Sequence, residues 1–213
     1  MGARYATEFR REWIPWGMAA TRAALGLVLI AGAMCAWNPL TLAGTVVMAL
    51  LSDIFDGVLA RRWGSDTPGV RLFDTMADTA FYLCTAVTLW AARPDALRHN
   101  ARMLAALLLL EAARLGFDLA KFGKPASYHS YLAKTWGLVM AIAVTATFAT
   151  QWGTVLLPLA LGLGIACNLE GLAMSVVLPL WRKDIKGLSA AWRIRSRLPV
   201  DTCGRNVGQL SGW

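Results

Sequence analysis

The chain has 213 residues, of which 57% are hydrophobic and 16% are charged. This balance excludes a disordered chain and a disulfide-stapled scaffold, and it leaves too few charges to coat a soluble domain of this size. Long apolar runs instead predict an all-α, polytopic membrane protein. The formal net charge of +8 comes from basic residues between these runs and near the C-terminus. They are expected to meet membrane lipids, and no nucleic-acid partner is expected.

Six apolar runs are long enough to cross a bilayer as transmembrane helices. Turn-forming residues such as Asn38-Pro39 and Gly123-Lys124-Pro125 separate them. The predicted cores of these helices are 17–36, 40–60, 72–92, 102–121, 132–150 and 154–181. Residues 1–16 carry aromatic side chains among charges, which predicts an amphipathic juxtamembrane helix lying in the interface. The expected organisation is therefore this helix, a six-helix membrane domain over 17–181, and a basic cytoplasmic tail over 182–213.

The basic residues also predict the orientation of the chain. Nearly all of the 21 lysines and arginines fall on the side of the termini, and cytoplasmic loops are enriched in these residues. We therefore expect both termini to be cytoplasmic, in a bacterial inner membrane. The end of the second helix and the start of the third helix would lie on the same side.

Four carboxylates stand out at those two helix ends. Asp53 and Asp56 are three residues apart, and Asp74 and Asp78 are four apart, so each pair lies on one helical face. Because the connecting loop is short, the two pairs are expected to meet at one membrane depth. Two divalent cations would balance four negative charges, and oxygen ligands favour Mg²⁺, Mn²⁺ or Ca²⁺ over zinc. Such a site is suited to phosphoryl chemistry. The alternative is that the acids cap helix ends or pair with nearby arginines.

The stretch from Asp53 through Arg61 to Asp78 resembles the signature of the CDP-alcohol phosphotransferase family, D-x2-D-G-x2-A-R-x8-G-x3-D-x3-D. Seven of its eight fixed positions are in register. Val70 stands where the family has its second glycine, and Gly69 is one place earlier. The six-helix layout and the amphipathic start also resemble this family.

The resemblance implies an enzyme that transfers a phosphatidyl group from CDP-diacylglycerol to a small alcohol and releases CMP. It implies that two Mg²⁺ or Mn²⁺ ions are held by Asp53, Asp56, Asp74 and Asp78. The last of these, Asp78, would be the general base that takes the proton of the alcohol. The CDP part would be cradled by Gly57, Ala60, Arg61 and Gly69. The resemblance also suggests a homodimer.

A pocket of basic side chains would suit an alcohol that carries its own phosphate. The candidates for it are Arg22, Arg114, Lys121, His129 and Lys134. Glycerol 3-phosphate is the leading acceptor, which would give phosphatidylglycerophosphate, and an inositol phosphate is the alternative. Equally, Arg114 can pair with Glu111 or Asp118 inside the bundle, while Lys121 extends to the interface.

Two other functions compete with this interpretation. A small cation transporter would also place acids within the membrane. Small residues such as Gly57 and Ala60 allow a nucleotide to approach the helix closely. A cation transporter binds no nucleotide, so it would not need small residues beside its acids. A catalytically inactive scaffold is the other alternative, and the displaced glycine alone favours it.

Overall fold

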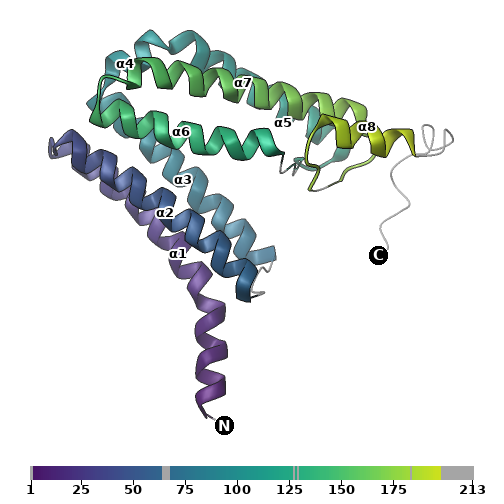
Figure 1. Cartoon of the computed structure of the whole chain (residues 1–213), viewed down its shortest axis with the longest axis horizontal. Helices are drawn as coiled ribbons and strands as arrows, with labels where there is room; N and C mark the ends of the chain where they lie inside the picture. Colours follow the sequence, from purple (N-terminus) through teal and green to yellow (C-terminus); the bar gives the residue numbers. More distant parts are fainter. Residues whose placement is uncertain (1, 64–67, 127, 129, 183, 198–213) are drawn as a thin grey trace. The chain divides into compact units, whose positions relative to one another are not determined.

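The structure, a computed structural model, describes residues 2–63, 68–126, 128, 130–182 and 184–197. It does not describe the side chains of residues 2–15, 56–63, 68–72 and 74–75. The secondary structure of the described part is entirely helical (Figure 1). Its helices are α1 (Gly2–Met34), α2 (Pro39–Trp63), α3 (Pro68–Ala92), α4 (Pro94–His99), α5 (Ala101–Phe122), α6 (Tyr131–Ala149), α7 (Gly153–Val177) and α8 (Leu188–Ser196).

The six long helices lie where the apolar runs predict them. Prolines occupy the first position of α2, α3 and α4, where the missing N–H group costs nothing. Gly123 ends α5 with a φ of 70°, a conformation that glycine adopts without strain. By length and composition, three described segments can cross a membrane, namely Trp16–Met34, Tyr131–Ala149 and Gly153–Val177. Six spans therefore remain a prediction.

The structure differs from the sequence prediction at four places. Residues 2–16 continue into the first apolar run as one helix, α1, instead of forming a separate helix. The last long helix ends at Val177 and not at residue 181, because Pro179 disfavours helical geometry at the residue before it. The short helices α4 and α8 were not predicted, and α8 lies in the segment expected to be a tail.

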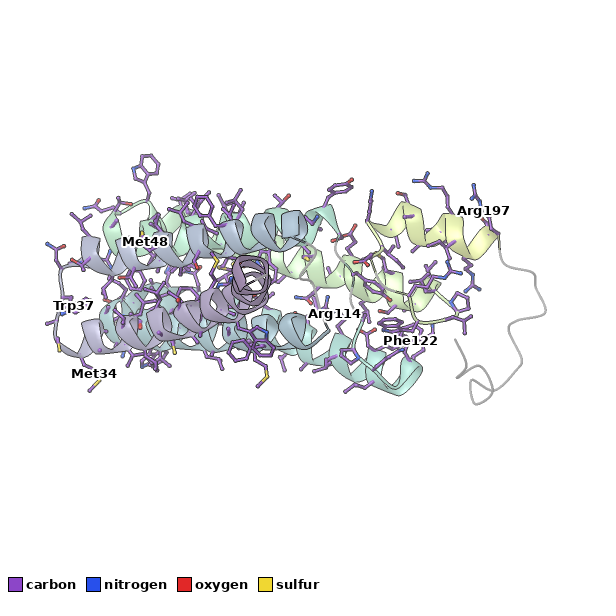
Figure 2. All side chains as sticks on the ribbon, turned by 90° about the horizontal axis from the view of Figure 1, so that it is seen from below. Met34, Trp37, Met48, Arg114, Phe122 and Arg197 are labelled. Carbon is purple, nitrogen blue, oxygen red and sulfur yellow. The ribbon has the colours of Figure 1, made fainter. Side chains whose placement is uncertain are left out.

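The chain divides into two compact units, which are described separately. The first unit contains the described residues up to Asn100 together with Met140–Leu157. In it, α1 packs against both α2 and α3. Large apolar side chains also point outward from this unit; Met34 is 82% exposed and Met48 is 61% exposed (Figure 2). Outward apolar side chains are expected where lipid tails, and not water, surround a helix.

Gly26 lets α1 approach α3 closely. A Cβ atom built on Gly26 would lie 3.1 Å from the Cβ of Cys84 and 3.3 Å from the Cα of Phe81. Both neighbours belong to α3, and the second is a backbone atom that cannot turn away. Arg22 lies one turn earlier on α1, so the same close approach holds its guanidinium against α2 and α3.

We expect Gly26→Leu to separate α1 from α3, at a cost of roughly 1–3 kcal/mol for an overpacked core. The apparent unfolding midpoint in detergent would fall, because Arg22 is displaced together with α1. Gly44→Leu on α2 is the matched control, since a Cβ at Gly44 meets nothing within 4 Å. Equal midpoints for the two variants would contradict this account of the packing.

The second unit contains Ala101–Val139 and the described residues from Pro158 onward. Glycines of α7 again allow close packing: a Cβ on Gly164 would lie 2.6 Å from Nε1 of Trp136. At the end of α7, the chain folds back so that α8 packs on the preceding helices. A buried apolar cluster of Met174, Leu178, Ile185 and Ala191 holds it there.

Candidate active site

Two of the four predicted acids have described side chains, and both belong to the first unit. Asp53 lies on α2 with its side chain 50% exposed, and Asp78 lies on α3 with its side chain 30% exposed. Both side chains are therefore partly accessible to a ligand and partly covered by protein. Their positions on the last turns of α2 and the early turns of α3 follow from the local helical periodicity.

Arg22 of α1 joins these two acids. Its Nη2 atom is 3.0 Å from Oδ1 of Asp53, and its Nη1 atom donates to Oδ1 of Asp78. The guanidinium side chain is only 3% exposed. A planar guanidinium can bond two carboxylates at once, and such charge-assisted contacts are stronger than neutral hydrogen bonds. The two acids are thus brought together by a third helix.

The two carboxylates supply oxygen donors from two neighbouring helices. Carboxylates from α2 and α3 bond the two ends of one guanidinium, so one cation already joins Asp53 to Asp78. Hard cations such as Mg²⁺ and Mn²⁺ prefer oxygen donors of this kind. Among the described side chains, no group of three or more potential metal ligands is present. The side chains of Asp56 and Asp74 lie outside that description.

The predicted nucleotide-binding residues also lie outside the described side chains. The backbone places Asp56, Gly57, Ala60 and Arg61 on the last turns of α2, which runs to Trp63. It places Gly69 and Asp74 in the first turns of α3, which begins at Pro68. Their roles therefore stay as the sequence predicts them.

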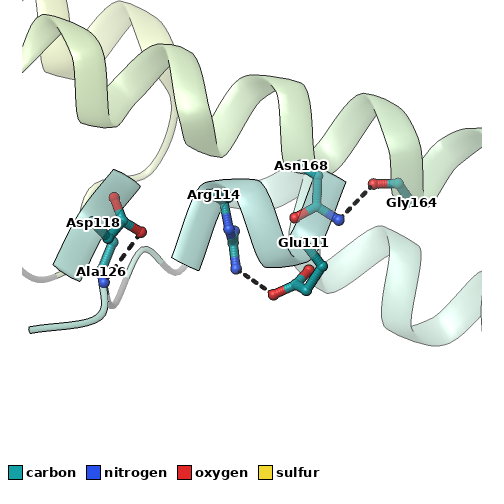
Figure 3. A network of polar contacts seen from close by, with 6 residues as sticks. All are labelled: Glu111, Arg114, Asp118, Ala126, Gly164 and Asn168. Carbon is teal, nitrogen blue, oxygen red and sulfur yellow. Dashed lines mark hydrogen bonds and ion pairs between the residues drawn. The ribbon is translucent and has the colours of Figure 1, made fainter. Parts of the chain in front are cut away.

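The predicted acceptor residues of α5 belong to the second unit, where they have protein partners. Nη2 of Arg114 donates to Oε1 of Glu111 at 2.8 Å, one turn away on the same helix (Figure 3). The ammonium of Lys121 donates to the backbone carbonyls of Ser175 and Val176, at 2.8 and 3.1 Å, near the end of α7. Lys134 is exposed on α6, and His129 lies outside the described residues.

Asp118 is the most buried of the described acids in this unit, at 2% exposure. Its Oδ2 atom accepts the N–H of Ala126 at 3.4 Å, which ties the segment after α5 to the helix (Figure 3). Nearby, the hydroxyls of Tyr128 and Ser175 are 3.1 Å apart. Burial raises the pKa of the Tyr128 phenol. A phenol is protonated at neutral pH even without this shift, so Tyr128 can donate a hydrogen bond.

Several buried polar atoms on α5 and α7 have no hydrogen-bond partner in the described part. They are Nε of Arg114, Oδ1 of Asp118, Oδ1 of Asn168 and Oε2 of Glu170. Each such atom costs about 1–3 kcal/mol if nothing satisfies it. Water or a hydroxyl-bearing molecule can therefore form hydrogen bonds with these four atoms.

Comparison with known families identifies the class of protein. Residues 13–180 match the CDP-alcohol phosphatidyltransferase family, and the chain belongs to it. Members of this family transfer a phosphatidyl group from a CDP-alcohol to an acceptor in phospholipid biosynthesis, and they generally use divalent metal ions. A comparison with curated proteins and a comparison with solved structures each yield no match.

Proposed function

We propose that this protein transfers the phosphatidyl group of CDP-diacylglycerol to a small alcohol on the cytoplasmic side of a bacterial inner membrane, releasing CMP. The observation that carries the proposal is the convergence of Asp53 and Asp78, from two helices, on the guanidinium of Arg22. These are the first and the last acid of the family signature, and one guanidinium bonds both.

The reaction needs a base, a bound diphosphate and a positive environment. Asp78 takes the proton of the alcohol, whose oxygen attacks the phosphorus that carries the lipid, and the bond to the CMP oxygen breaks. Arg61 binds phosphate oxygens, while Gly57, Ala60 and Gly69 leave space for the nucleotide. Asp53, Asp56, Asp74 and Asp78 would hold two Mg²⁺ or Mn²⁺ ions, which would supply charge stabilisation of the phosphates.

Arg22 has a different role from the acceptor-binding role that its charge suggests. With both ends of its guanidinium on Asp53 and Asp78, it positions the two acids and balances their charge before cations bind. The other basic residues predicted to bind the acceptor belong to the second unit, where Arg114 shares its charge with Glu111 and Lys134 is exposed.

Glycerol 3-phosphate is the acceptor that we propose, with an inositol phosphate as the alternative in the same family. Purified protein with labelled CDP-diacylglycerol and Mn²⁺ should release CMP only when the correct alcohol is added. A panel of glycerol 3-phosphate, inositol phosphate, serine and choline identifies it. We expect rate differences of about 100-fold or more, because a site built for a phosphate leaves its polar groups unpaired when an alcohol without a phosphate binds.

The panel also separates the competing functions. Release of CMP with serine or choline, and not with either phosphorylated alcohol, would overturn the proposed acceptor while leaving the reaction intact. No CMP release with any acceptor, together with Mn²⁺ uptake into proteoliposomes, would favour a cation transporter. The control is the same assay with EDTA in place of Mn²⁺.

A further inference from the structure

A half-open cavity lies between the start of α6, the segment after α7 and α8, and it shares no residue with the acids. Its volume is about 560 Å³, and it lies wholly within the second unit. The polar residues that line it are Tyr131, Arg182, Asp184, Lys186, Ser189 and Arg193. Three basic side chains against one acidic side chain give the described lining a net positive charge. The cavity is therefore suited to an anion.

The basic side chains that line the cavity have no acidic partner among the described residues. Within the described residues, the side chains of Arg182 and Lys186 make no hydrogen bond or ion pair, and both are exposed. The Nε atom of Arg193 bonds only the backbone carbonyl of Ser189, at 3.3 Å, which fixes its orientation and leaves its charge uncompensated. Arginine and lysine placed in this way bind phosphate oxygens strongly.

The start of α8 adds to this positive potential. The helix begins at Leu188, next to the cavity, and no side chain caps its N-terminus in the described structure. Unpaired N–H groups and the helix dipole make such an end favourable for negative charge. The helix is held in place by Ala191, which is completely buried.

The surroundings of the cavity favour a lipid over a soluble anion. Tyr131 on its rim is 65% exposed, and Trp192 on α8 is 58% exposed. Exposed aromatic residues beside basic ones are typical of the membrane–water interface, where the ring meets lipid and the charge meets the headgroup. The preceding α7 is long and apolar enough to cross a membrane. The cavity at its end would therefore lie at the membrane–water interface.

We propose that this cavity binds the phosphodiester headgroup of an anionic phospholipid, through Arg182, Lys186 and Arg193 and the N-terminus of α8. The site is independent of the proposed reaction, because none of its residues belongs to the family signature. Binding would dock α8 on the membrane surface and anchor the C-terminal end of the enzyme there.

The test measures binding by the full-length protein in an uncharged detergent, by native mass spectrometry. The probes are a short-chain phosphatidylglycerol, the matching phosphatidylcholine and inorganic phosphate. We expect the wild-type protein to retain phosphatidylglycerol preferentially. The double variant R182Q/K186Q should bind it roughly 25-fold more weakly, at about fivefold for each removed charge. The matched control is Arg197→Gln, at the end of α8 (Figure 2), which removes a charge outside the cavity and should leave affinity unchanged.

Three results would overturn the proposal. They are equal retention of phosphatidylcholine, an equal loss in the Arg197→Gln control, and binding of inorganic phosphate as tight as that of the lipid. If the double variant does not fold, Ser189→Asp places a negative charge in the same cavity and should weaken lipid binding similarly. Because the readout is lipid binding and not CMP release, failure here leaves the proposed reaction untouched, and the converse also holds.

Discussion

Replacement of Asp78 by asparagine is expected to reduce turnover by about 1,000-fold or more. A positioned general base contributes roughly 10²–10⁴ to a rate, and an amide cannot accept the proton of the alcohol. The change is nearly isosteric, so the hydrogen bond to Arg22 is weakened but α3 remains in place. The measurement is CMP release from CDP-diacylglycerol at saturating acceptor and Mn²⁺.

The matched control is Asp95→Asn. Asp95 belongs to the same unit, but its side chain is 95% exposed and its only described ion pair is a loose one with Arg98, at 3.7 Å. We expect the control to keep full turnover. If Asp78→Asn kept more than about a tenth of the wild-type rate, Asp78 would not be the base. Another acid of the signature would then carry that role.

Replacement of Arg22 by glutamine is expected to destabilise the metal-free protein by about 2 kcal/mol. Removing one partner of a buried ion pair costs about 3–5 kcal/mol, but solvent reaches Asp53 and Asp78 and moderates the loss. The apparent unfolding midpoint in EDTA should fall by roughly 5 °C. Arg22→Lys should recover part of this, because it restores the charge without the two-ended geometry of a guanidinium.

The same variant has an opposite effect on cation binding. Because Arg22 occupies the position between two carboxylates, its removal should tighten Mn²⁺ binding severalfold, measured by electron paramagnetic resonance of free Mn²⁺. Turnover should still fall, since the acids lose their positioning group. Arg98→Gln is the control, as its side chain is 67% exposed. The role assigned to Arg22 would be wrong if the two variants had equal midpoints and equal Mn²⁺ affinities.

Local information in the sequence was sufficient for most of the fold. Apolar runs and the prolines and glycines between them determine where the long helices begin and end, because these are properties of neighbouring residues. The same local spacing places Asp53 and Asp56, and Asp74 and Asp78, on single helix faces. The signature that these acids share with Gly57 and Arg61 was enough to indicate the family that the comparison identifies.

Where local patterns conflict with longer-range packing, the sequence was a poorer guide. The last long helix was predicted too long because its apolar run continues past Pro179. The helix α8 was missed because its charges are typical of a solvated tail, whereas buried contacts of Ala191 with the end of α7 hold it. Sequence spacing also left two roles open for Arg114, binding of the acceptor phosphate or an ion pair with a neighbouring acid. The bond to Glu111 supports the ion pair.

The sequence by itself determined the class of enzyme, the helices and the acids, because periodicity and motif spacing act over one or two turns. Only the tertiary structure decided which cation faces those acids. Arg22 is 31 residues from Asp53 and 56 residues from Asp78, and no local pattern relates them. Their contact depends on the packing of α1 against α2 and α3, which the missing side chain of Gly26 permits. A long-range contact of this kind arises from shape, and it exists only once the helices are assembled.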